Sequence, residues 1–165
     1  MRLFKPQKQN IDKVFQRYGD MLYRIALTRL SNDADAQDVV QDVFVKYLGN
    51  PPSFKDDEHE KAWFLRTAIN CCHDFARRQK TREHMPIDEA YGIAAENDDG
   101  VRDLMALLSQ LPPIYKDVVI LHALEGFGVD ETARLLGISL SCAKMRLSRA
   151  REILNILRKE EDNVY

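Results

Sequence analysis

The sequence predicts an all-α protein made of two small helical domains joined by a flexible acidic linker. Apolar residues recur at spacings of three and four along most of the chain, which is the period of an amphipathic helix. Long alternating runs of β-branched residues, typical of strands, are absent. Residues 85–103 lack sustained periodicity, are rich in acidic residues and contain Pro86, Gly92 and Gly100. The chain therefore divides into residues 1–84, a linker at 85–103 and residues 104–165.

The first part predicts three helices. Apolar residues from Ile11 to Ile25 keep helical spacing in a helix that ends near Leu30, and Gly19 is a candidate position for a kink or a break. A second helix covers residues 33–48 and is closed by Gly, Asn and two prolines. A third helix runs from residue 58 to residue 82 with a continuous apolar stripe.

The second part predicts a four-helix domain that contains a helix-turn-helix. Two helices span residues 104–111 and 114–124, with two prolines between them. A short helix then begins near Val129, and Gly137 suits the left-handed turn that ends it. Ser139 is placed to cap a longer helix rich in Lys and Arg, and Ala133 is small enough for two helices to cross closely. An ordinary helical hairpin with a solvated charged face is the alternative interpretation.

Charge and cysteine content exclude several classes of protein. The formal net charge of −2 is uninformative alone, because the acidic linker offsets basic segments on both sides of it. Cys71, Cys72 and Cys142 show neither a CxxC motif nor metal-ligand spacing, so we expect buried or idle thiols and neither a disulfide nor a zinc site. The N-terminus has no signal-peptide core, and no stretch reaches the roughly 18 apolar residues of a membrane span, so we expect a cytoplasmic protein.

The second predicted helix carries a line of acidic residues. Asp35, Asp38 and Asp42 repeat at spacings of three and four, with Gln41 beside them. Like charges at this spacing destabilise a helix, which favours a basic protein partner or a divalent metal held as in helical Mg²⁺-dependent enzymes. A solvated face is the third interpretation. The metal is disfavoured because no second carboxylate cluster has comparable spacing.

The third predicted helix has a polar face suited to nucleic acid. Arg66, Asn70, His73 and Arg77 line up at spacings of four, three and four, and more basic residues follow. Arginines bind phosphates bidentately, and Asn and His can bond base edges or backbone. Nearby aromatic residues could stack on unpaired bases, although packing in the core is the usual fate of such residues. A solvated or capping histidine is the alternative for His73.

These segments resemble the extracytoplasmic-function sigma factors, a bacterial family with two helical domains called region two and region four. Residues 33–48 followed by AWFLRTAINCCHDFARRQ look like region two, with Trp63, Asn70, Asp74 and Arg77 at the family's spacing. The stretch LSQLPPIYKDVVILHALEGFGVDETARLLGIS, followed by RAREIL, looks like region four. Two separate signatures in the right order cover nearly the whole chain.

The resemblance implies a promoter-specificity subunit that joins core RNA polymerase, recognises the −35 and −10 elements and assists strand opening, without being an enzyme. It also implies an anti-sigma partner and a monomer when free of polymerase. The docking surface for the polymerase clamp helices would be Asp35, Asp38, Gln41 and Asp42. Region two would contact the −10 element through Phe54, Trp63, Arg66, Asn70, His73, Arg77 and Arg78. Region four would contact the −35 element through Ser141, Lys144, Met145, Arg146, Ser148, Arg149 and Arg151.

The chain departs from the family pattern at a few positions. Gly128 stands where a capping Ser is usual, which leaves a looser cap or gives that role to Asp130, and Thr132 replaces an Ile. The recognition helix begins with SCAKM, which differs from the sequence of many family members at this place. The base preference of relatives therefore does not predict that of this chain. A stand-alone helix-turn-helix regulator would account only for the second part, and a metal-dependent enzyme only for the aspartates. We expect no cofactor and no metal.

Overall fold

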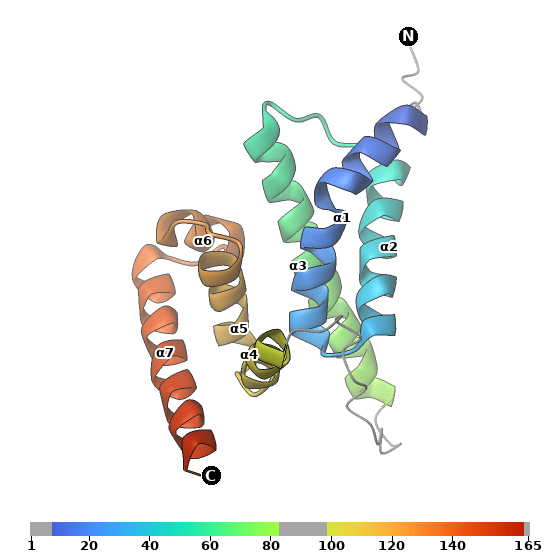
Figure 1. Cartoon of the computed structure of the whole chain (residues 1–165). Helices are drawn as coiled ribbons and strands as arrows, with labels where there is room; N and C mark the ends of the chain where they lie inside the picture. The colour runs from blue at the N-terminus through green and yellow to red at the C-terminus, as the bar shows by residue number, and fades with distance from the viewer. Residues whose placement is uncertain (1–7, 83–98, 164–165) are drawn as a thin grey trace.

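The computed structural model of the protein describes residues 8–82 and 99–163, and across these ranges it is helical with no strand. Figure 1 shows two groups of helices side by side, one built from each end of the chain. The all-α prediction is confirmed. The prediction of a flexible linker falls largely on residues outside the described ranges.

The first group is a bundle of α1 (Lys8–Leu30), α2 (Asp33–Gly49) and α3 (Asp57–Arg82). Each of these helices contacts the other two, and their apolar stripes meet in a core that includes Leu22, Val43 and the fully buried Phe64. α1 is one helix through Gly19, where an added Cβ would lie 3.4 Å from the ring of Phe15. The glycine therefore accommodates an aromatic side chain and does not divide the helix.

The corner between α1 and α2 fixes where α2 starts. Ser31 adopts a positive φ of 53°, and the Asn32 side chain caps α2 by accepting a hydrogen bond of 3.0 Å from the backbone N–H of Asp35. The Tyr23 hydroxyl also donates to Asp33. Burial, aided by this hydrogen bond, raises the pKa of Tyr23 to about 12, so the phenol stays protonated as a donor at neutral pH. These contacts set the rotation of α2 about its axis.

The second group contains α4 (Asp99–Ser109), α5 (Pro113–Val119), a π-helix η1 (Ile120–Leu124), α6 (Val129–Leu136) and α7 (Leu140–Asp162). Two details differ from the sequence prediction. α4 begins at Asp99 rather than at residue 104, and the helix expected over 114–124 is continuous but widens into π geometry at Ile120. α4, α5, α6 and α7 contribute to a core that includes Leu108, Val118 and Leu147.

The helix-turn-helix forms as predicted. Gly137 ends α6 in the left-handed conformation, with φ 67° and ψ 33°. The Ser139 hydroxyl caps α7 by accepting a hydrogen bond of 3.1 Å from the backbone N–H of Cys142. At the start of α6, Gly128 makes no side-chain cap, and Asp130 pairs with Arg134 instead, so the looser of the two expected caps is present.

Thr132 on α6 provides a test of stability. Its side chain is fully buried, and no residue that the structure describes forms a hydrogen bond with its hydroxyl. Thr132→Val removes an unsatisfied buried hydroxyl and is expected to raise stability by about 1 kcal/mol, or roughly 2–4 °C in Tm. Thermal unfolding followed by circular dichroism measures the shift.

The control is Thr28→Val, because the Thr28 hydroxyl is also buried but donates a hydrogen bond of 2.7 Å to the carbonyl of Arg24. This variant loses a satisfied contact and is expected to be neutral or less stable than the native chain. A lower Tm for Thr132→Val would contradict the prediction.

The two groups of helices share an apolar junction. α1 contacts α4 and α5, and α3 contacts α6. Ile120, Leu121 and Leu135 from the second group are buried within the core of the first. Figure 1 accordingly shows α4 and α5 beside α1, whereas α7 lies on the outer side of the second group.

The three cysteines are free thiols in different environments. Cys71 and Cys72 on α3 are buried, as expected, and Cys142 near the start of α7 is partly exposed. Burial raises the pKa of the Cys72 thiol to about 12 and also raises that of Cys71. Within the described ranges, no group of His, Cys, Asp and Glu side chains is arranged to hold a metal ion, and no helix has the length and apolarity to cross a membrane.

Candidate nucleic-acid and protein interfaces

The outer face of α7 presents the side chains predicted to contact DNA. Ala143, Leu147 and Ala150 are buried and hold the helix against the rest of its domain. The opposite face is exposed at Ser141, Lys144, Met145, Ser148, Arg149 and Arg151, and Arg146 is half-buried at its border. One helix thus packs with one face and exposes a basic face with the other.

The predicted DNA-binding face of α3 is divided between solvent and the second group of helices. Asn70 and Arg77 are exposed, and Arg77 pairs with Asp74 one turn away. Arg66 donates a hydrogen bond of 3.5 Å to the carbonyl of Arg134 on α6. His73 Nε2 lies 3.2 Å from an oxygen of Asp117 on α5. Two of the four side chains therefore also contact the second group, although Arg66 is exposed and the His73 side chain is 43% exposed.

The remaining residues predicted for the −10 element differ in exposure. Arg78 is exposed near the end of α3. Trp63 and Phe54 are half-buried, with ring centroids 6.1 Å apart. The Trp63 ring also packs against Tyr47 and Phe64, at 6.0 Å and 5.0 Å. Both aromatic rings are thus part of the edge of the first core, and each keeps an exposed side.

The acidic line of α2 lies on the surface. Asp38, Gln41 and Asp42 are exposed and Asp35 is half-buried. Burial, with a smaller effect of the neighbouring Asp38 charge, raises the pKa of Asp35. The line continues into Val45 and Leu48, which are 65% and 45% exposed. We call the exposed surface of Asp38, Gln41, Asp42, Val45 and Leu48 the α2 face.

Sequence reasoning missed the apolar end of the α2 face, although a signal was present. Val45 and Leu48 continue the line from Asp42 at spacings of three, away from the buried positions of the same helix. Two exposed large apolar residues beside three polar ones are typical of a protein-binding surface rather than of a merely solvated helix face.

A buried ionic cluster joins the two groups of helices and was also missed. Arg29 on α1 and Asp117 on α5 have side chains only 6% and 7% exposed, and Arg29 Nε lies 3.0 Å from Asp117 Oδ1. The N–H bond does not point along this line, so the contact is an ion pair without an aligned hydrogen bond. Lys116 is buried beside the pair, and burial followed by the Arg29 charge lowers its pKa.

A cavity of about 410 Å³ lies between the start of α3 and α6. Its walls carry charges of both signs, including Lys61, Arg66 and Arg134 against Asp56 and Glu131. The Lys61 ammonium lies 4.7 Å from the centre of the Phe127 ring, which adds a cation–π contact across the junction.

Comparison with protein families matches both groups of helices. The sigma-70 region 2 model matches residues 14–82, and the sigma-70 region 4 model matches residues 102–154. Among curated relatives, RNA polymerase sigma factor SigV of Bacillus subtilis is 30% identical over 142 residues, covering 85% of this chain and 86% of the relative. ECF RNA polymerase sigma factor SigM of Mycobacterium tuberculosis is 29% identical over 143 residues, covering 85% of this chain and 72% of the relative.

Solved structures share the fold across both groups. The sigma factor RpoE of Bartonella quintana, crystallised with the anti-sigma factor NepR, superposes with a TM-score of 0.76 at 24% identity over 92% of this chain and 98% of that one. CnrH in complex with the cytosolic domain of CnrY gives a TM-score of 0.69 at 24% identity, covering 94% and 91%. Taken with the family matches, these likenesses show that the chain belongs to the extracytoplasmic-function RNA polymerase sigma factors of the sigma-70 family, transcription initiation factors that direct RNA polymerase to promoters.

Proposed function

We propose that three surfaces of this chain have separate roles in promoter recognition. α7 reads the −35 element, the polar face of α3 binds the −10 element, and the α2 face with Asp35 docks on the clamp helices of polymerase. The observation that carries this proposal is that the basic face of α7 and the α2 face are exposed to solvent. The other faces of these two helices are buried in the apolar cores. Residues 1–84 then act as region two and residues 104–165 as region four.

The chemistry of α7 suits the major groove. A helix-turn-helix inserts its second helix so that side chains near its N-terminus reach base edges. Ser141, Lys144, Met145, Ser148 and Arg149 take these positions, whereas Arg146 and Arg151 bond phosphates and fix the register. The Met145 side chain, which is 56% exposed, adds an apolar surface suited to a thymine methyl group.

The chemistry of α3 suits a strand that is being opened. Arg66, Arg77 and Arg78 bond phosphates, and Asn70 and His73 bond base edges or backbone. Phe54 and Trp63 present partly exposed rings next to the start of α3, where a base removed from the stack can be received. Extruding a base costs a few kcal/mol, which such stacking offsets.

The α2 face suits a basic helical partner with an apolar strip. Its carboxylates favour fast, reversible association with a positive surface, and Val45 and Leu48 add the desolvated contacts that slow dissociation. The factor has no catalytic role of its own and acts in the cytoplasm, where the polymerase is.

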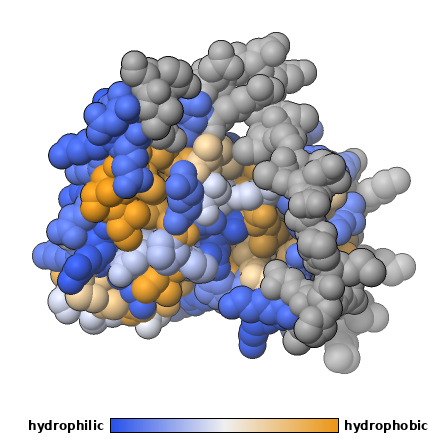
Figure 2. Space-filling model, turned by 90° about the horizontal axis from the view of Figure 1, so that it is seen from below, coloured by the Kyte–Doolittle hydropathy of each residue, from blue (hydrophilic) through white to orange (hydrophobic). Residues whose placement is uncertain are grey.

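An anti-sigma factor is the second protein partner that we propose. One of the structural neighbours described above, RpoE of Bartonella quintana, is a sigma factor in complex with the anti-sigma factor NepR. The second group of helices also exposes apolar side chains such as Leu104, Ile114 and Ile156. Figure 2 shows a hydrophobic patch on the side formed by this group, bordered by hydrophilic residues. A patch of this kind suits a helix of a protein partner.

Run-off transcription with core polymerase on a randomised promoter library tests the proposal. The expected result is enrichment of templates with defined −35 and −10 elements, dependent on both polymerase and this chain. A protein that binds a specific duplex tightly as a dimer and fails to join core polymerase would instead be a stand-alone regulator, which was the alternative from sequence.

Lys144→Ala is expected to lower promoter use by about tenfold, the loss of one good base or phosphate contact of ~1–3 kcal/mol. Association with core polymerase should not change, because Lys144 is exposed on α7, away from α2. Lys159→Ala on the exposed end of the same helix is the matched control and should behave as the native chain. Equal loss in both variants would mean that overall charge, not a specific contact, is being measured.

A further inference from the structure

We propose that His59, an exposed residue in the first turn of α3, is a positioning residue for the −10 element: it holds Phe54 where the ring can receive an unstacked base. This inference rests on the proposed role of Phe54 and deepens it. His59 acts through Phe54 and needs no contact with DNA. The sequence patterns described above point to Phe54 and Trp63 but not to His59.

The segment that carries Phe54 has few polar contacts of its own. It connects α2 to α3, and residues 51 and 52 are prolines, which have no backbone N–H to donate. In the part of the chain that the structure describes, residues 51–55 make one hydrogen bond, in which the Lys55 backbone N–H donates to His59 Nδ1 at 3.2 Å. His59 is therefore the polar anchor of this segment.

This hydrogen bond acts directly on the backbone of Phe54. The Lys55 N–H belongs to the planar peptide unit that joins Phe54 to Lys55. Because the N–H is held toward His59, the rotation of that unit is fixed, and this limits the ψ angle of Phe54. Nδ1 accepts a hydrogen bond only when it carries no hydrogen, so the contact uses the neutral imidazole with its hydrogen on Nε2.

The imidazole ring also contacts the Phe54 side chain. The two ring centroids lie 5.5 Å apart and the ring planes meet at 90°, the edge-to-face arrangement that aromatic pairs prefer. Phe54 meets a second ring of α3, that of Trp63, at 6.1 Å and 61°. His59 thus restrains both the backbone and the side chain of Phe54, whose ring remains half-buried with an exposed side.

The turn that carries His59 is itself fixed on the first group of helices. The His59 backbone N–H donates to the Asp56 side chain at 2.7 Å, which caps the start of α3. On either side of His59, Asp57 and Glu60 pair with Arg17 of α1 at 3.1 and 3.6 Å. The histidine therefore connects a mobile type of segment, a proline-containing loop, to a turn that α1 holds in place.

A ring that is already in position binds an unstacked base better than one that must first be ordered. Ordering one free side chain weakens an interaction by about two- to tenfold. The loss falls on promoter opening, when the base leaves the stack, and not on the joining of core polymerase. Because His59 is exposed, its replacement should change the stability of the core little.

Three substitutions separate the contacts of His59. His59→Ala removes both the acceptor and the ring. His59→Asn keeps an acceptor near the position of Nδ1, whereas His59→Leu keeps apolar bulk without an acceptor. Circular dichroism checks that each variant folds as the native chain does.

Two measurements are made on each variant. The first is quenching of tryptophan fluorescence by acrylamide in the full chain without polymerase, which reports on Trp63 alone because the chain has one tryptophan. The second is the rate of promoter opening by polymerase that carries the variant, on a template recovered from the randomised promoter library.

His59→Ala and His59→Leu are expected to slow promoter opening about fivefold, because Phe54 must be ordered as the base arrives. Both should also make Trp63 more accessible to acrylamide, since the Phe54 ring beside it is loosened. His59→Asn should return both readouts close to the native values. Affinity for core polymerase should stay the same in all three variants.

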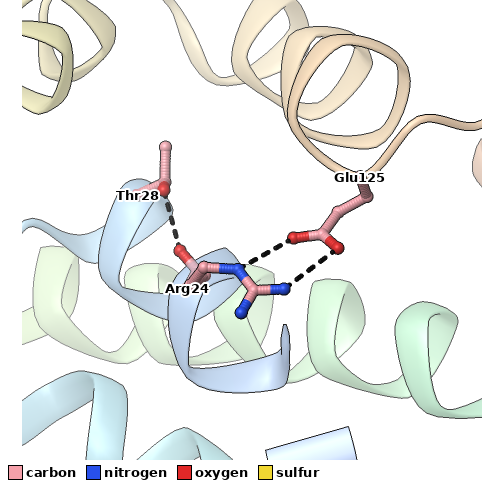
Figure 3. A network of polar contacts seen from close by, with 3 residues as sticks. All are labelled: Arg24, Thr28 and Glu125. Carbon is pink, nitrogen blue, oxygen red and sulfur yellow. Dashed lines mark hydrogen bonds and ion pairs between the residues drawn. The ribbon is translucent and has the colours of Figure 1, made fainter. Parts of the chain in front are cut away.

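Arg24→Ala is the control for losing an exposed polar contact elsewhere in the chain. Figure 3 shows the Arg24 guanidinium reaching from α1 to the Glu125 carboxylate, with two N–H groups facing two oxygens, each at 3.4 Å. The Arg24 side chain is 59% exposed, and its printed partners lie outside the segment that carries Phe54. Trp63 quenching should stay at its native value in this variant.

Native quenching in His59→Ala would overturn the positioning role, and so would equal slowing of promoter opening by His59→Asn and His59→Leu. Phe54→Ala separates this inference from the assignment on which it rests. Slow opening in Phe54→Ala together with native opening in His59→Ala overturns the inference alone. Native opening in Phe54→Ala would instead remove Phe54 from the −10 site.

Discussion

Replacing Asp38 and Asp42 together with Lys is expected to weaken association with core RNA polymerase by about 30-fold or more, ~2 kcal/mol, because two attractive contacts become repulsive. Both side chains are exposed on α2, so the reversal should leave the fold intact. Titration of labelled core polymerase, with circular dichroism as the check on folding, measures the effect. Promoter use should fall in parallel and recover partly at high protein concentration.

The matched control reverses Asp12 and Asp20, two exposed aspartates on α1, to Lys. It adds the same total charge away from the α2 face and should change polymerase affinity by less than about threefold. Raising the ionic strength should narrow the gap between the two variants, since exposed charges are screened. Equal polymerase affinity for both variants would show that the α2 face is not the docking surface.

The second large effect is expected at Phe64, where Phe64→Ala should cost about 4 kcal/mol of stability, a large part of the ~5–15 kcal/mol typical of folded proteins. The ring is fully buried and contacts four other aromatic rings: those of Tyr18, Phe44, Tyr47 and Trp63, at centroid distances of 4.7, 5.7, 5.2 and 5.0 Å. Chemical denaturation measures the loss.

Because Phe64 lies on α3, this loss also removes support from the helix proposed to bind the −10 element. Promoter opening should therefore become temperature-sensitive in the variant. Phe15→Ala is the control, since the Phe15 ring is 54% exposed and, among the described residues, its one aromatic neighbour is Phe44, at a centroid distance of 5.0 Å. Its expected cost is below about 1 kcal/mol. Similar losses at both positions would mean that the aromatic cluster is not the centre of the bundle.

Local features of the fold were predictable from the sequence because their causes are local. Gly137 and Ser139 fix the turn of the helix-turn-helix through backbone conformation and a single cap. The small Ala133, predicted to lie where two helices cross closely, is buried. The end of α2 likewise follows from the Gly, Asn and prolines after it, and the extent of α3 follows from its helical periodicity.

The junction was not predictable, because its partners are distant in sequence and each has a plausible local interpretation. The sequence suggests that Asp117 is an exposed acid on a short helix. In the structure it is buried and lies within hydrogen-bond distance of His73, 44 residues away in the sequence. The sequence suggests that Arg66 is a DNA contact, and in the structure it also donates a hydrogen bond to the carbonyl of Arg134, 68 residues further along the chain. Periodicity specifies the buried side of a helix but not which other helix covers it.

The change to π geometry at Ile120 was also missed. Nothing in the letters ILHAL differs from an ordinary α-helix. The geometry brings Ile120 and Leu121 into the core of the first group and places Glu125 against Arg24. The contacts of this π-helix are with residues distant in sequence, so its geometry could not be predicted from the periodicity of one segment.

The environments of the three cysteines have a practical consequence for watching the protein at work. The thiolate is the form that reacts with maleimide dyes, and raised pKa values keep the buried Cys71 and Cys72 protonated at neutral pH. Brief labelling therefore directs a fluorophore to Cys142, beside the Ser139 cap at the start of α7. Without any engineered substitution, the unaltered chain can then report in real time whether α7, the helix proposed to read the −35 element, meets a promoter.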